Sequence, residues 1–142
     1  FWSLRLDEVR LGNTPLQGCS AGCDAVFDSA TPVLVAPRSW ADELNQLSSI
    51  ERDCDRVDEA GELRLRVGEE WLVLRTADFV LSQPSLKRCT LALAGSVTLS
   101  AHTLVLGAVF LKAFRVYFDF AAWRVGLAPA LAPAGPRPYA AV

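Results

Sequence analysis

The sequence has little net charge and lacks several patterns on which common catalytic and metal sites depend. Its formal net charge is −2 at pH 7, whereas a nucleic-acid-binding face needs a basic excess. His102 is the only histidine, so a Ser-His-Asp or Cys-His arrangement would have to use it, and its surroundings predict a loop or edge residue instead. There is no glycine-rich phosphate loop, and the acidic residues between 51 and 59 do not follow the EF-hand register. We therefore predict no nucleic-acid partner, no cofactor and no metal.

An uninterrupted apolar run of membrane-spanning length is also missing. Residues 89–111 carry no Asp, Glu, Lys or Arg, which is long enough to raise the question of a transmembrane helix. Polar side chains nevertheless interrupt this stretch, at Thr90, Ser96, Thr98, Ser100, His102 and Thr103. Their alternation with apolar residues has the period of a half-buried strand. We predict strands here and no membrane span.

Length and composition indicate one globular domain. The chain has 142 residues, of which 51% are hydrophobic and 21% charged, enough to form a core of its own. We predict a domain over residues 1–130 and a flexible proline- and alanine-rich tail over residues 131–142. The first residues are strand-like and form no signal peptide, so we expect this sequence to be part of a longer precursor.

The four cysteines, Cys19, Cys23, Cys54 and Cys89, allow three pairings. Cys19 and Cys23 bracket a tight loop, which favours their mutual pairing and leaves Cys54 with Cys89. In the chain-entropy model these two bridges contribute about 2 and 4 kcal/mol. A four-thiolate zinc site is disfavoured because the Cys-x2-Cys spacing is absent. Disulfides predict an oxidising compartment, either outside the cell or in a vesicular, lysosome-like lumen.

Alternating apolar and polar residues predict an all-β fold, mainly β with one or two short helices. Two hairpins are expected, one joining residues 63–67 to 71–74 and one joining 114–118 to 123–127. Ser39 is the expected cap of a helix from Trp40 to about Leu47, whose apolar face includes Trp40, Leu44 and Leu47. A second short helix is expected after Gly107.

Asp28 is the main candidate for chemistry. It ends an apolar run, residues 25–27, and enters a turn of small residues, Ser29-Ala30-Thr31. A carboxylate at the end of a buried strand is costly unless its hydrogen bonds are satisfied. Taken alone, such an aspartate is more often a turn former than a catalyst.

The order of the surrounding motifs resembles the C-terminal lobe of a pepsin-like aspartic protease. In that family the lobe opens with a Tyr-Trp-type strand, matched here by Phe1-Trp2, and a small cysteine loop precedes the hydrophobic-hydrophobic-Asp-Thr/Ser-Gly-Thr/Ser segment. It closes with hydrophobic-hydrophobic-Gly, a short helix, Phe-Asp and Val-Gly-Leu-Ala, matched by Val105-Leu106-Gly107, Phe118-Asp119 and residues 125–128. The resemblance covers residues 1 to about 130 and implies one lobe of the pepsin-like double-ψ β-barrel fold.

The resemblance implies a role for each residue of the Asp28 loop. Asp28 would be one of two catalytic aspartates that share a proton and activate water for peptide-bond hydrolysis. The second aspartate would come from an N-terminal lobe, in the same precursor or in a separate chain, and the substrate would be a peptide or protein. The implied supports of the catalytic loop are Ser29, Ala30, Thr31 and Gly107, and the implied cleft residues are Pro32, Val105 and Leu106.

Three residues depart from the family pattern. Ala30 replaces a nearly invariant Gly, and its methyl group restricts φ and crowds the approach of a substrate. Pro32 replaces the usual Ser and removes both a hydroxyl and a backbone N–H. Ala108 stands where many family members that work at acidic pH have Asp. An alanine at this position is compatible with activity. The alternative function is therefore a catalytically inactive pepsin-fold protein with a binding or assembly role.

Overall fold

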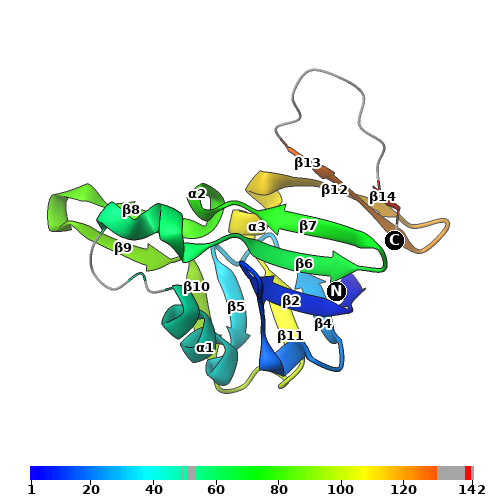
Figure 1. The fold of residues 1–142 in the computed structure, drawn as a ribbon. Helices are drawn as coiled ribbons and strands as arrows, with labels where there is room; N and C mark the ends of the chain where they lie inside the picture. The colour runs from blue at the N-terminus through cyan, green and yellow to red at the C-terminus, as the bar shows by residue number, and fades with distance from the viewer. Residues whose placement is uncertain (49, 51–53, 131–139, 142) are drawn as a thin grey trace.

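Short strands make up most of the computed structural model, which describes residues 1–48, 50, 54–130 and 140–141 (Figure 1). The strands form sheets of five, four, three and two members. The helices in the described part are short, with bounds α1 Arg38–Ser48, α2 Thr76–Phe79 and α3 Ala108–Ala113. The 3₁₀ segments are η1 Gln17–Cys19, η2 Cys54–Ala60 and η3 Pro84–Leu86. The all-β prediction is confirmed.

The five-stranded sheet positions the Asp28 loop. Its order is β1-β4-β11-β5-β10, with bounds β1 Ser3–Leu6, β4 Cys23–Phe27, β11 Thr103–Leu106, β5 Leu34–Pro37 and β10 Leu93–Ser96. The strand β11 runs parallel to β4 and meets β5 in the antiparallel sense at Val105 and Val35. It therefore lies between the two strands that residues 28–33 connect. This is the ψ-shaped arrangement that the family resemblance implied.

The remaining strands form antiparallel sheets. The four-stranded sheet has the order β3-β2-β6-β7, with bounds β3 Thr14–Pro15, β2 Glu8–Leu11, β6 Leu63–Val67 and β7 Glu70–Leu74. The other two sheets contain β12 Phe114–Asp119, β13 Arg124–Pro129 and β14 Ala140–Ala141, and β8 Val80–Gln83 with β9 Arg88–Leu91. Both predicted hairpins are confirmed. Two residues of the predicted tail form β14, and residues 131–139 and 142 lie outside the described part.

Helix α1 differs from the prediction at its start and in its buried face. Strand β5 ends at Pro37 and the helix begins at the next residue, so Ser39 is a helical residue and not the cap. Trp40 and Leu44 are 2% and 3% exposed, but Leu47 is 37% exposed. The buried face runs through residues 40, 41, 44 and 48, which leaves Leu47 at its margin.

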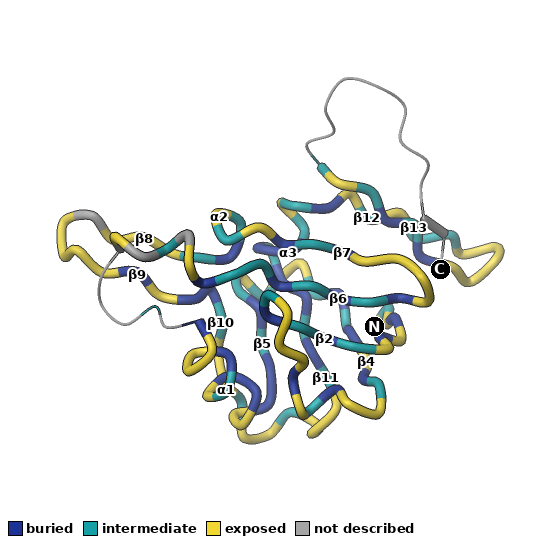
Figure 2. The backbone as a smooth tube through the Cα atoms, viewed as in Figure 1, coloured by how far each residue is buried: buried dark blue, intermediate teal, exposed yellow. Residues whose placement is uncertain are grey.

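One hydrophobic core joins the sheets. Strand β6 buries Leu63, Leu65 and Val67 and turns its arginines outward, as the alternation in the sequence predicts. Its buried residues share one cluster with those of β4 and β11, and Figure 2 shows buried segments along the inner strands β5 and β11.

In the described residues no helix has both the length and the apolarity to cross a membrane. The uncharged stretch of residues 89–111 instead contains β10, β11 and part of α3.

Candidate functional site

Asp28 lies directly after β4, and its backbone is fixed by neighbouring segments. Its N–H donates to the carbonyl of Leu106 over 3.2 Å, which extends the pairing of β4 with β11 by one residue. The N–H of Thr31 donates to the carbonyl of Asp28 over 3.3 Å and closes a turn. The aspartate is therefore held at the point where the chain leaves the sheet.

The Asp28 carboxylate accepts one hydrogen bond on each oxygen. The Thr31 hydroxyl donates to Oδ2 over 2.6 Å, and the Ala30 N–H donates to Oδ1 over 2.9 Å. Both donors stabilise the charged form, so the Thr31 hydroxyl and then the Ala30 N–H lower the pKa of Asp28 below its usual value. Asp28 is half-buried, so it remains partly accessible to solvent. The contact predicted between Thr31 and Asp28 is present.

Gly107 lies against the backbone of the Asp28 loop. A Cβ at this position would come within 2.1 Å of the Val33 carbonyl oxygen and 2.4 Å of the Thr31 carbonyl oxygen. The next residue, Ala108, donates its N–H to the same Thr31 carbonyl over 2.7 Å. Only glycine allows β11 to approach so closely. The Ala108 contact was not predicted from the sequence, although the neighbouring Gly107 was.

The remaining residues predicted for the site differ in exposure. Ser29, Ala30 and Pro32 are exposed, and Val105 is half-buried. Leu106 is 0% exposed, so its side chain belongs to the core beneath the loop and cannot line a cleft surface, contrary to the prediction. This burial follows from the alternation of β11, which turns Leu104 and Leu106 toward the core.

Ala30 fits the loop without backbone strain. Among the described non-glycine residues, positive φ occurs at Lys87 and Trp123 and not at Ala30. A glycine is therefore not required here for its conformation. The N–H of Ala30 still reaches Asp28, and its methyl group is exposed. The replacement changes the surface that a ligand would meet and leaves the hydrogen bond to the carboxylate intact.

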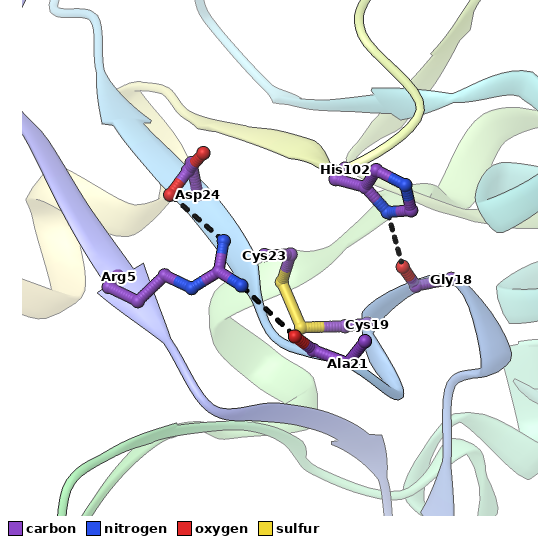
Figure 3. Close-up of a disulfide and its surroundings, with 7 residues drawn as sticks. All are labelled: Arg5, Gly18, Cys19, Ala21, Cys23, Asp24 and His102. Carbon is purple, nitrogen blue, oxygen red and sulfur yellow. Dashed lines mark hydrogen bonds and ion pairs between the residues drawn. A yellow bond between two sulfur atoms is a disulfide. The ribbon is translucent and has the colours of Figure 1, made fainter.

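The predicted disulfide between Cys19 and Cys23 is present, with both residues fully buried (Figure 3). Arg5 donates from Nη2 to the Ala21 carbonyl over 3.0 Å and pairs with Asp24 over 3.3 Å, and these contacts fix the outer side of the loop. Cys89 is also disulfide-bonded. The side chain of Cys54, its predicted partner, lies outside those described, so that pairing stays a prediction.

His102 lies at the far end of the strands that carry Asp28. It precedes β11, whereas Asp28 follows β4, and the two strands are paired in parallel over four residues. The register places His102 level with Cys23, five residues before Asp28, so the two lie roughly 16 Å apart along the sheet at the usual rise per residue. The His102 ring instead meets the Gly18 carbonyl over 3.3 Å.

In the described part of the chain, no three His, Cys, Asp or Glu side chains are grouped to hold a metal ion.

Asp119 has a structural role in the turn between β12 and β13. The Asp119 carboxylate accepts from the N–H groups of Ala121 and Ala122 over 3.1 and 3.0 Å, and it pairs with Arg124. The Ala122 N–H, followed by Arg124, lowers the pKa of Asp119. This aspartate shapes the turn between β12 and β13 and is not a second carboxylate for Asp28.

The comparison with known proteins identifies the family. The family model for eukaryotic aspartyl proteases matches residues 1–130. Together with the strand arrangement around Asp28, this match shows that the chain belongs to the eukaryotic aspartyl protease family and forms one β-rich lobe of the pepsin-like fold.

Several mammalian proteases align with nearly the whole chain. The sequence is 27% identical to mouse gastricsin over 92% of this chain, and 27% identical to dog pepsin B over 90%. It is 28% identical to mouse cathepsin E over 92% of this chain. The alignments cover 36%, 35% and 36% of these relatives, so the chain spans about a third of their length.

Proposed function

We propose that this chain is the C-terminal lobe of an aspartic endopeptidase and that Asp28 is one of its two catalytic carboxylates. The observation that carries the proposal is the hydrogen-bonded, half-exposed Asp28 carboxylate on a loop braced by β11. Thr31 holds the carboxylate through its hydroxyl, and Gly107 permits the close packing beneath it. Ser29 is exposed on this loop and would contact the corresponding aspartate loop of the N-terminal lobe.

The chemistry requires a second lobe. Two carboxylates a few ångströms apart cannot both ionise, so they share one proton and hold a water molecule between them. One carboxylate takes a proton from the water as it attacks the scissile carbonyl, while the other donates a proton to the carbonyl oxygen. Asp119 is fixed in a separate turn and does not serve as this second carboxylate. The proposal therefore requires an N-terminal lobe that supplies the other catalytic aspartate.

The substrate is an extended peptide or protein segment bound in a cleft between the lobes. Such peptides are held largely through backbone hydrogen bonds. On this side of the cleft, the exposed Pro32 and the half-buried Val105 contribute surface. The enzyme works in an oxidising compartment, outside the cell or in a vesicular lumen, and the Cys19–Cys23 bridge supports this location.

Ala30 and Pro32 support a second candidate function, a catalytically inactive pepsin fold that binds a partner. Ala30 adds an exposed methyl group beside the carboxylate. Pro32, also exposed, has no N–H with which to hold an extended peptide. Both changes alter the surface that meets a substrate and leave the Asp28 hydrogen bonds in place.

A cleavage assay separates the two functions. The full-length two-lobe protein is incubated with a peptide library, with pepstatin as the inhibitor control. We expect pepstatin-sensitive cleavage that is lost in the Asp28→Asn variant and retained in Asp24→Asn. Asp24 is a matched control because it lies on the same strand, exposed and paired with Arg5.

Each outcome of this assay has a defined meaning. Cleavage that persists in Asp28→Asn contradicts the catalytic role of Asp28. Absence of cleavage by a folded two-lobe protein favours the inactive alternative. A full-length protein whose other lobe has no corresponding aspartate also contradicts the enzyme proposal, because one carboxylate cannot supply both acid and base.

A further inference from the structure

The hairpin of β8 and β9 projects from the body of the molecule (Figure 1). Its strands form a separate two-stranded sheet, paired from Val80 with Leu91 to Gln83 with Arg88. Residues 84–87 connect the strands at the tip. An isolated two-stranded hairpin is marginally stable in water, so its stability depends on what it packs against.

The hairpin is anchored in the core at two places. Leu91 is buried at its base, and Cys89, paired with Ser82 one step before the tip, is buried and disulfide-bonded, whereas residues 81–83 and 85–88 are exposed (Figure 2). Leu81 and Leu86 are 48% and 61% exposed, so even the apolar side chains of the outer half are in solvent. Segments with few buried contacts open locally at low free energy. The tip, residues 83–88, can therefore open without unfolding the core.

Two neighbouring cationic residues, Lys87 and Arg88, lie at this tip. Both are exposed, and Lys87 has a φ of 48°, which is uncommon for a residue other than glycine. In the described part of the chain, neither side chain pairs with a carboxylate. Most other described cations do pair with one, namely Arg5, Arg10, Arg38, Arg64, Arg66, Arg75 and Arg124.

We propose that the Lys87–Arg88 peptide bond is a processing site for a serine protease that recognises basic side chains. Such a protease binds the free cation of Lys87 in an acidic pocket, and the exposed strands let the chain extend into its cleft. Water adds across the bond, the C–N bond breaks, and the products are a carboxylate on Lys87 and a new amino group on Arg88. Exposed loop tips are preferred sites of such cleavage.

A disulfide keeps the two products together. Cys89 is disulfide-bonded and lies in the second fragment, while Cys19 and Cys23 pair with each other in the first. The predicted partner of Cys89 is Cys54, which also lies in the first fragment. Processing therefore converts one chain into two disulfide-linked chains and leaves Asp28 on the first of them.

Limited proteolysis tests the proposal on the full-length protein. Dilute trypsin is added, and the first products are separated with and without reductant and identified by N-terminal sequencing. We expect the first cut to create an amino terminus at Arg88. In this lobe, the fragments should separate only after reduction. The double variant Lys87→Asn, Arg88→Gln should lose this cut, because asparagine tolerates the positive φ and glutamine removes the second cation.

The control variant is Lys112→Gln, which removes an exposed cation within α3 and should leave the cut unchanged. Thermal unfolding of each variant verifies that loss of cleavage does not reflect a change in stability. A first cut in this lobe at any other bond, including those in residues 51–56, overturns the proposal. So does cleavage at Lys87 that requires prior unfolding of the protein by heat or denaturant.

Discussion

The acidity of Asp28 depends chiefly on one hydroxyl group. In Thr31→Val the donor to Oδ2 is lost while the shape of the side chain is nearly kept, so we expect the pKa of Asp28 to rise. The carboxyl carbon signal of Asp28, followed by NMR as a function of pH, measures this change. Thr31→Ser keeps a hydroxyl and should titrate closer to the wild-type protein.

The same hydrogen bonds make stability depend on pH. The pKa of Asp28 is lower in the folded state, so its contribution is present above the ordinary carboxyl pKa and is lost as pH falls through the lowered folded value. In Thr31→Val, the loss of folding stability at acidic pH should therefore be smaller. An unchanged pKa in Thr31→Val would show that the Ala30 N–H alone keeps the carboxylate ionised.

Gly107 is the residue of the site that tolerates substitution least. A Cβ in Gly107→Ala would meet two carbonyl oxygens of the Asp28 loop at 2.1 and 2.4 Å, so backbone must move. Overpacking of this kind costs about 1–3 kcal/mol, which denaturant unfolding can measure. Gly126→Ala is the matched control, because its nearest contact, at 3.5 Å to Tyr117 Cβ, is ordinary. Equal stability of the two variants would contradict the close approach.

At the scale of the elements, the apolar face of α1 predicted from the sequence differs from the face that is buried in the structure. Leu44→Ala should lower the free energy of unfolding by about 2–5 kcal/mol, because Leu44 is 3% exposed in the core. Leu47→Ala should change it by about 0.5 kcal/mol or less, because Leu47 is 37% exposed. Denaturant unfolding measures the free energy of unfolding of both variants. Similar losses of stability would show that Leu47 lies on the buried face of the helix, as the sequence predicted.

Local patterns predicted the elements better than their ends. The hairpin of β6 and β7 follows from strict alternation and a Gly-Glu turn, both of which are encoded within a few residues. The sequence predicted that α1 starts at Trp40 with Ser39 as its cap, whereas the helix starts at Arg38. In the structure β5 leads directly into the helix at Pro37, so no cap signal marks the boundary.

In the candidate site, too, contacts between neighbouring residues were predicted better than contacts between distant segments. The contact of Thr31 with Asp28 spans three residues, and the motif predicted it correctly. The alternation of β11 also indicates which of its residues are buried, but the bond from Ala108 to Thr31 depends on how β11 inserts between β4 and β5. Segments about eighty residues apart meet there, and the spacing of residues in the sequence does not encode such a meeting.

At the scale of the whole molecule, an aromatic cluster joins the first residues to the last long hairpin. The Trp2 ring lies 5.1 Å from Phe118, 5.0 Å from Phe120 and 5.7 Å from Trp123, between ring centroids. The N–H of Phe27 also donates to the Trp2 carbonyl over 3.0 Å. Trp2 therefore connects the sheet that carries Asp28 with the β12–β13 hairpin.

Trp2→Ala should destabilise the whole lobe because it removes three ring contacts at once. Trp2 is partly buried, so we expect a loss of roughly 2 kcal/mol, below the about 3–5 kcal/mol of a fully buried aromatic residue. Phe1→Ala is the matched control, since Phe1 is 102% exposed and should contribute almost nothing. Denaturant unfolding followed by tryptophan fluorescence measures both variants in the full-length protein. If the two alanine variants unfold at the same denaturant concentration, the cluster does not hold the hairpin to the core. The other core contacts of β12 and β13, which include Phe114, Val125, Leu127 and the contact of Phe118 with Phe27, then stabilise it.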